Sequence, residues 1–220
     1  MIGGIEMKEN STELVFILDR SGSMSGLETD TIGGFNSMLE KQKKESGEAF
    51  VTTVLFDDKY ELLHDRYDIK GVNLLTEKEY YVRGSTALLD AIGITINNIG
   101  KALSDTNEED RPGKVLFVII TDGMENSSRE FSYEKVKEMV EHQKSKYSWD
   151  FIFLGANIDA IKTANSFGIS ADMATNFVSD SVGTQLNYKI VSEVVSSFRK
   201  GKKVDKSWKD EIEKDYNKRG

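Results

Sequence analysis

The sequence predicts an α/β fold of three layers: a doubly wound, mostly parallel central sheet with one antiparallel edge strand, covered by helices on both faces. Three observations predict it. Short apolar runs alternate with helical patterns along the chain, which implies right-handed crossovers and parallel strands. The most apolar runs are continuous, as in strands that are buried on both faces. Two strand candidates are separated only by a short turn, which permits antiparallel pairing.

Six segments have the composition of strands. The first is a continuous aliphatic run that ends at a turn, and the fourth is the most apolar run of the chain and is expected at the centre of the sheet. The second is β-branched and aromatic, and the third can pair with it as a hairpin. In chain order, the expected strands are Leu14–Leu18, Phe50–Phe56, Tyr60–His64, Val115–Ile120, Phe151–Leu154 and Met173–Val178, the last at an edge.

Five segments have the periodicity of amphipathic helices. In the first, Ile32, Phe35 and Met38 fall on one face. Ser132 is a plausible N-cap of the third, and Gly168 ends the fourth. The expected helices are 27–45, Ala87–Leu103, Tyr133–Lys146, Ile158–Phe167 and Thr184–Phe198.

One domain is expected over residues 1–200, followed by a charged basic C-terminal tail or short helix over 201–220. Residues 199–220 hold nine Lys or Arg against five Asp or Glu, a net charge of about +4 in a chain whose net charge is -8. Ser207 and Asp210 have capping-box spacing, and Trp208 is the one large anchor. Two interpretations stay open: a solvated or loosely docked helix, or a segment that binds the acidic body of this or another molecule.

Composition excludes several classes of site and partner. The chain of 220 residues is 38% hydrophobic and 30% charged, which is ordinary for a globular protein. Its acidic balance argues against a general nucleic-acid partner. The absence of cysteine excludes disulfides and thiolate sites, and no apolar run reaches the roughly 18 residues of a membrane span. The N-terminus lacks the pattern of a signal peptide, so a cytoplasmic location and no membrane partner are expected.

Hard oxygen donors occur in three loops that should meet at one edge of the sheet. Asp19-Arg20-Ser21-Gly22-Ser23 follows the first strand, Arg83-Gly84-Ser85-Thr86 leads into a helix, and Thr121-Asp122-Gly123 follows the central strand. Ligands of open α/β sheets bind beyond the carboxyl ends of the strands, where these loops converge. Such a set suits Mg²⁺, Mn²⁺ or Ca²⁺ better than zinc or copper.

These three motifs resemble those of the von Willebrand factor A (vWA) family. The first looks like its D-x-S-x-S motif, Thr86 matches its threonine loop, and Asp122 matches its third element. The resemblance covers about residues 10–200, in the right order and on the right elements. It implies a Rossmann-like vWA fold, a metal-ion-dependent adhesion site (MIDAS) and a protein partner that presents an Asp or Glu carboxylate to the bound cation.

The resemblance also implies a role for each candidate ligand. Ser21 and Ser23 would coordinate Mg²⁺ directly, and Thr86 directly or through water. Asp19 and Asp122 would act mainly through bound water. A cation held by neutral hydroxyls keeps its charge, so a partner's carboxylate can complete the octahedron that Mg²⁺ prefers. In some members the threonine loop and an aspartate exchange as ligands when a partner binds.

Several polar residues have simpler interpretations. Asp19 and Ser21 on their own could cap the following helix, but Thr86 and Asp122 make a metal site the better explanation. Glu125 and Asn126 could reach the rim of the site, but we expect them to be exposed loop residues. Asp90 could orient the threonine loop, cap a helix or face solvent. Asp57-Asp58 resembles a paired-carboxylate catalytic site, but it is expected to form a turn. His64 and His142 are expected to be structural or exposed.

The favoured function is a non-enzymatic, metal-dependent protein-interaction module. The alternative is a Mg²⁺-dependent phosphohydrolase of the haloacid-dehalogenase type, since Asp19 follows one strand and Thr121 ends another. Those enzymes commonly use D-x-D, however, and the second acidic position is Ser21 here. Nucleotide binding is disfavoured, because the chain has neither G-x-x-x-x-G-K-[ST] nor a convincing G-x-G-x-x-G after a strand.

Overall fold

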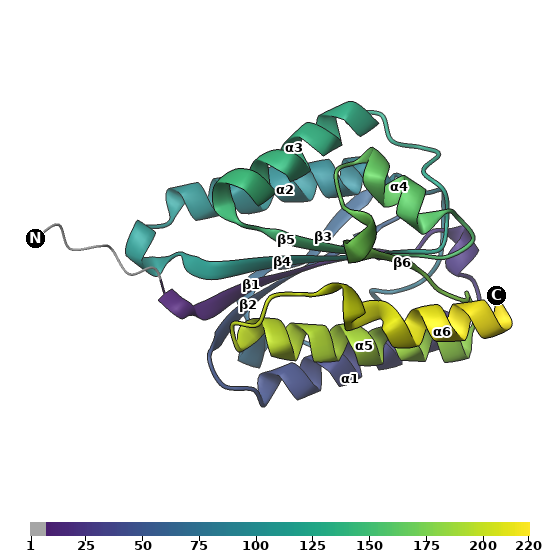
Figure 1. Cartoon of the computed structure of the whole chain (residues 1–220), viewed down its shortest axis with the longest axis horizontal. Coiled ribbons are helices and arrows are strands. Elements are labelled where there is room, and N and C mark those ends of the chain that lie inside the picture. The colour runs from purple at the N-terminus through teal and green to yellow at the C-terminus, as the bar shows by residue number, and fades with distance from the viewer. Residues whose placement is uncertain (1–7) are drawn as a thin grey trace, which may run out of the picture.

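A six-stranded sheet lies between two layers of helices in the computed structural model, which describes residues 8–220 (Figure 1). The strands are β1 (Lys8–Asp19), β2 (Glu48–Phe56), β3 (Tyr60–Asp68), β4 (Pro112–Thr121), β5 (Asp150–Gly155) and β6 (Ala174–Asn176). Their order is β3-β2-β1-β4-β5-β6. The pair β2–β3 is antiparallel and the other pairs are parallel. The predicted fold class, with its antiparallel edge strand, is therefore confirmed. Residues 1–7, where no signal peptide is expected, lie outside the described part.

The helices form two layers, one on each face of the sheet. They are α1 (Glu28–Lys43), α2 (Leu88–Asp105), α3 (Tyr133–Tyr147), α4 (Ala160–Ser166), α5 (Ser181–Arg199) and α6 (Asp210–Arg219). Figure 1 shows α1, α5 and α6 on one face and α2, α3 and α4 on the other. Alternate residues of β1 supply the two cores: Leu14, Phe16 and Leu18 face α1 and α5, whereas Val15 and Ile17 face α2. Within residues 8–220, no helix combines the length and the apolar character that a membrane crossing requires.

The strands β1 to β5 are longer than the sequence-based expectation and β6 is shorter; β1 shows the largest difference. β1 extends toward the N-terminus as far as Lys8, because Ser11, Thr12 and Glu13 continue its pairing with β2 and β4 although they are polar. A search for apolar runs misses such residues. β6 is only three residues long and starts at Ala174, one residue later than expected. It is an edge strand, as predicted.

Side-chain caps set the starts of several helices. Ser132 caps α3 as predicted, accepting a hydrogen bond from the Lys135 amide at 3.2 Å. Asp159 caps α4 and Asp180 caps α5, so α4 starts two residues later than expected and α5 three residues earlier. Both Asp residues lie outside the apolar pattern on which the expected boundaries depended.

The C-terminal segment packs onto the domain. Ile212 of α6 is 1% exposed and joins the core beneath α1 and α5. The buried Lys209 ammonium donates to the carbonyl oxygens of Ala171 and Ala174, each at 2.8 Å. The predicted capping box is wrong, because Asp205 rather than Ser207 caps this segment, with its side chain accepting from the Ser207 amide. Residues 201–220 thus contact the body of the same molecule.

Candidate metal centre

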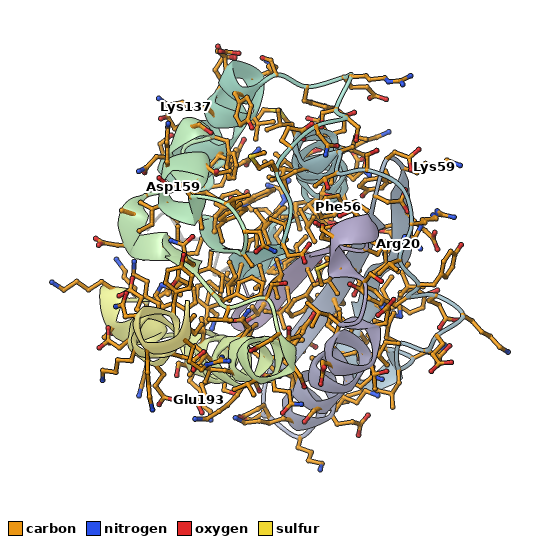
Figure 2. The ribbon with its side chains drawn as sticks, turned by 90° about the vertical axis from the view of Figure 1, so that its right-hand side faces the viewer. Arg20, Phe56, Lys59, Lys137, Asp159 and Glu193 are labelled. Carbon is orange, nitrogen blue, oxygen red and sulfur yellow. The ribbon has the colours of Figure 1, made fainter. Side chains whose placement is uncertain are left out.

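The three candidate loops converge at the carboxyl edge of the parallel strands. β1 and β4 are neighbours and pair in register up to Leu18 and Ile120, so Asp19 and Asp122 both follow paired strand ends. Figure 2 looks onto this edge, where Arg20 and Phe56 lie near the ends of β1 and β2. The threonine loop is joined to the first motif by a hydrogen bond from the Gly22 amide to the Gly84 carbonyl at 3.2 Å.

Three hydroxyl groups surround one point at this edge. The hydroxyl oxygens of Ser21 and Ser23 lie 3.0 Å apart. A side chain at Gly123 would place its Cβ 3.0 Å from the Ser23 and Thr86 hydroxyls and 3.8 Å from that of Ser21. Only glycine therefore leaves the space among these hydroxyls open. Ser21 and Thr86 are buried whereas Ser23 is exposed, so the group opens to solvent on the side of Ser23.

Asp19 lies beneath these hydroxyls and already accepts hydrogen bonds through both carboxylate oxygens. The Ser21 amide donates to Oδ1 at 2.6 Å, and the Thr121 hydroxyl donates to Oδ2 at 2.5 Å. The side chain is 1% exposed, and burial raises its pKa to about 6. The buried Tyr80 hydroxyl donates to the Asp19 carbonyl at 2.5 Å, which fixes the backbone at the start of the motif.

Asp122 has one carboxylate oxygen bound and one left over. The Ser179 hydroxyl donates to Oδ2 at 3.1 Å. Oδ1 is buried and finds no hydrogen-bond partner among the described residues. Burial raises the pKa of this carboxyl group. A buried carboxylate oxygen without a donor is costly, and a cation would satisfy it.

The residues present fit a hard divalent cation. All five candidate side chains offer oxygen, three of them as neutral hydroxyls, which is the chemistry that Mg²⁺, Mn²⁺ and Ca²⁺ prefer. No Lys or Arg forms an ion pair with Asp19 or Asp122 within residues 8–220, so their negative charge is not balanced by the protein there. The same part of the chain holds no group of three or more His, Asp or Glu side chains arranged for a metal. The hydroxyl-rich group is thus the candidate centre.

The loop after β4 forms hydrogen bonds with the start of α2 and with the threonine loop, which the sequence analysis does not predict. Glu125 is partly buried rather than exposed, so that expectation is wrong: its carboxylate accepts from the Leu89 amide at the start of α2 at 2.9 Å and from the Ser128 amide at 2.7 Å. Asn126 is exposed as expected, but it forms two hydrogen bonds with the backbone of Thr86, accepting at 2.9 Å and donating at 3.0 Å. No local pattern predicts the bonds to Leu89 and Thr86, because these partners lie 36 and 40 residues away in the sequence.

The Asp90 side chain binds the loop after β4 rather than the threonine loop, although orienting the threonine loop is one of the roles that the sequence leaves open. Its carboxylate accepts hydrogen bonds from the consecutive amides of Arg129, Glu130 and Phe131 at 2.8–2.9 Å. Glu125 thus caps the start of α2, and Asp90 in the first turn of α2 holds the same loop farther along. This reciprocal arrangement joins the threonine loop to the loop that carries Asp122.

The remaining candidates contribute none of the three hydroxyls. His64 is buried on β3, 3.0 Å from the Thr53 hydroxyl, and burial lowers its pKa. His142 packs edge-on against Tyr147 on α3. Asp57 lies in the β2–β3 turn as predicted, accepting from the Lys59 amide at 2.8 Å, but it is fully buried. No pattern in the sequence indicates that burial.

Comparisons with known proteins agree with this architecture. No family model matches the sequence, and the comparison with curated proteins gave no match either. Among solved structures, the chain is similar to a von Willebrand factor type A protein from Catenulispora acidiphila, with 15% identity and a TM-score of 0.55 over 85% of this chain and 43% of that one. It is also similar to proximal thread matrix protein 1 of the mussel byssus with a zinc-occupied MIDAS motif, with 14% identity and a TM-score of 0.57 over 86% and 47%.

A mutant of the PilB minor pilin from Streptococcus sanguinis is a third similar structure, with 11% identity and a TM-score of 0.59 over 90% of this chain and 63% of that one. The chain spans less than two thirds of the length of each of these three proteins. At such low identity the likeness concerns the fold. Sheet order, helix layers and these comparisons together show that the chain has the von Willebrand factor A fold.

Proposed function

We propose that the chain is a metal-dependent protein-interaction module whose centre is formed by Asp19, Ser21, Ser23, Thr86 and Asp122. The observation that carries the proposal is the convergence of three hydroxyls around Gly123, the residue after Asp122, whose buried Oδ1 has no hydrogen-bond partner among residues 8–220. Ser21 and Ser23 would hold the cation directly and Thr86 directly or through water, with Asp19 and Asp122 acting mainly through water. When bound, the cation supplies a positive charge that can accept a carboxylate from another molecule.

Mg²⁺ is the cation we favour, with Mn²⁺ and Ca²⁺ as alternatives, because every donor is a hard oxygen. The zinc-occupied motif of the mussel protein supports a divalent cation in general. The partner would be a protein that presents Asp or Glu. Exposure of Ser23 supports this, since it leaves the centre open to a partner's side chain. A cytoplasmic location stays a prediction based on composition.

Phosphoryl transfer to Asp19 is the less favoured function. A nucleophilic carboxylate needs an accessible oxygen, whereas Asp19 is 1% exposed and both of its oxygens accept hydrogen bonds from Ser21 and Thr121. This geometry supports a structural and electrostatic role for Asp19 beneath the hydroxyls. Hydrolysis of a generic phosphate ester that depends on Mg²⁺ and is lost in Asp19→Asn would favour the enzyme instead.

Thermal unfolding with Mg²⁺ and with EDTA tests the proposal. We expect Mg²⁺ to raise the melting temperature of the wild type and to leave that of Asp122→Ala unchanged, because ligands stabilise only the folded state that binds them. Asp159→Ala is a matched control at the same edge of the sheet (Figure 2): it removes the N-cap of α4, which should cost about 1 kcal/mol, but should keep the response to Mg²⁺. A wild type that does not respond to Mg²⁺, Mn²⁺ or Ca²⁺ would contradict the proposal.

A partner assay tests the second half of the proposal. Candidate partners recovered with the wild type should be lost both in EDTA and with Asp122→Ala, while Asp159→Ala should retain them. A partner recovered equally under all conditions would bind elsewhere on the molecule and would not support a role for the cation.

A further inference from the structure

We infer that Asp57 is a positioning residue that holds the D-x-S-x-S loop and the threonine loop at the spacing the cation needs. The inference rests on the proposed metal function and adds a residue outside its ligand set. Asp57 lies in the turn between β2 and β3, on a segment that contributes no hydroxyl to the centre. Its carboxylate is fully buried and lies between two arginines, one from each loop.

One carboxylate oxygen of Asp57 receives both arginines. The Arg20 Nε donates to Oδ2 at 3.0 Å, and the Arg83 Nε donates to the same oxygen at 2.6 Å. Arg20 is the second residue of the D-x-S-x-S motif, between Asp19 and Ser21, and Arg83 lies three residues before Thr86. The carboxylate therefore joins the two loops by charge-assisted hydrogen bonds, which are stronger than neutral ones.

The backbone of the same turn adds to this connection. The Asp57 carbonyl accepts from the Ala87 amide at 2.8 Å, directly after Thr86, and the Phe56 carbonyl accepts from the Arg20 amide at 2.8 Å. Between the loops themselves, the Arg83 amide donates to the Arg20 carbonyl at 2.9 Å. Both loops are thus tied to the turn on the residues that flank the candidate ligands.

The charge of Asp57 is needed as well as its shape. The guanidinium groups of Arg20 and Arg83 lie 5.3 and 5.2 Å from the centre of the Tyr81 ring, so two cations share a small space. Arg20 is fully buried, and the other acid near them, Glu61, is 43% exposed and lies 2.6 Å from Arg20 but 3.9 Å from Arg83. Without the Asp57 charge, the two cations would repel each other and the loops would move apart.

A close approach at Gly84 shows how tightly the turn and the loop are packed. Gly84 has a φ of +66°, and a Cβ there would contact the Asp58 carboxylate and would lie 3.4 Å from the Asp57 Cβ. The threonine loop therefore lies directly against the turn. Because Mg²⁺ demands a nearly ideal octahedron, even a small displacement of Thr86 from Ser21 and Ser23 should weaken binding.

Calorimetric titration with Mn²⁺ alone, at a temperature well below the melting temperature, measures the affinity for the metal and tests the inference. Residues that support metal ligands typically change affinity about 10–100-fold when mutated, and we expect a loss of that size in Asp57→Asn. Arg83→Gln, at a side chain that is 35% exposed, should fold even if Asp57→Asn does not, and should lower the affinity for Mn²⁺ about tenfold in the same assay.

Glu13→Gln is the matched control. Glu13 is a fully buried carboxylate paired with Arg66 at 2.9 Å, on the same sheet but midway along β1, six residues before Asp19. Its replacement removes the charge of a buried carboxylate beside an arginine, as Asp57→Asn does, but outside the candidate loops, so it should leave the affinity for Mn²⁺ unchanged. Affinity changes that follow from the loss of any buried carboxylate charge would appear in this variant as well.

The outcomes separate the inference from the proposed function. A wild type that does not bind Mn²⁺ overturns both. A wild type that binds Mn²⁺, with Arg83→Gln and any folded Asp57→Asn binding equally well, overturns the role of Asp57 and leaves the proposed function intact. Loss of affinity in these variants but not in Glu13→Gln supports it.

Discussion

Replacing Asp19 by Asn should stabilise the protein in EDTA and abolish its response to Mg²⁺. Asp19 is 1% exposed, and burial raises its pKa from 3.8 to about 6. At pH 7.5 the ionised carboxylate therefore lowers the free energy of unfolding by about 3 kcal/mol relative to an unperturbed Asp, since each pKa unit corresponds to about 1.4 kcal/mol. Asn keeps the shape of the side chain and removes the charge.

The surroundings of Asp19 can accept an amide. Its Oδ1 position accepts from the Ser21 amide, which the amide oxygen of Asn can also do. The amide nitrogen can donate to the Thr121 hydroxyl, which then turns toward the Gly123 carbonyl 3.3 Å away. Hydrogen bonds to a neutral amide are weaker than those to a carboxylate, so we expect a net gain of about 1–3 kcal/mol in EDTA.

Urea denaturation at pH 7.5, in EDTA and in excess Mg²⁺, measures this effect. The folded-state pKa of Asp19 lies above its unfolded value, so the stability of the wild type in EDTA should fall as the pH rises from about 4 to above 6, and Asp19→Asn should lack this part of the slope. Asp159→Asn, at an exposed N-cap where Asn is equally suitable, should change neither the stability in EDTA nor the stabilisation by Mg²⁺. A variant less stable than the wild type in EDTA, or one that Mg²⁺ still stabilises, would refute the reasoning.

Three further predictions concern the scaffold. Ile212→Ala should lower the free energy of unfolding by about 2–4 kcal/mol in urea denaturation, because this side chain of α6 is 1% exposed; unchanged stability would show that α6 does not support the domain. Gly34→Ala should be strongly destabilising, because its Cβ would clash with the Tyr188 ring. Gly33→Ala has open space around it and should stabilise α1 by up to about 1 kcal/mol. Equal melting temperatures for these two variants would contradict this prediction. Burial raises the pKa of Glu13, so stability should fall as the pH rises through that pKa, and Glu13→Gln should flatten the profile of stability against pH.

The sheet and the edge at which the candidate loops meet could be predicted because their signals are local. Leu14–Leu18 and Val115–Ile120 are apolar on both faces, which identifies the buried neighbours β1 and β4. Once two parallel strands are neighbours, the residues after them share an edge, so the convergence of Asp19 and Asp122 follows from topology. The antiparallel hairpin could also be predicted, because two strands joined by a short turn pair antiparallel.

The supports of the site could not be predicted, because each joins residues far apart in sequence. Glu125 caps α2 across 36 residues, and Asp57 meets Arg20 across 37. Asp57 is next to a second Asp in a turn, a position that usually indicates exposure, and its burial follows only once two arginines cover it. Lys209 is similar: its sequence neighbours suggest a solvated charge, but the carbonyls of β6 and the preceding turn bind it.

The supporting charges and the ligand hydroxyls occupy different places around the candidate centre, and this division would allow three neutral hydroxyls to be held rigidly. Asp57, Glu125 and Asp90 bind the loops from outside, through guanidinium groups and backbone amides. The hydroxyls of Ser21, Ser23 and Thr86 face inward around Gly123. If the supporting carboxylates faced the cation instead, they would neutralise it and leave no charge to attract a partner's acid. In the proposed centre, the ionic supports would fix the geometry and the hydroxyls would preserve the charge of the cation.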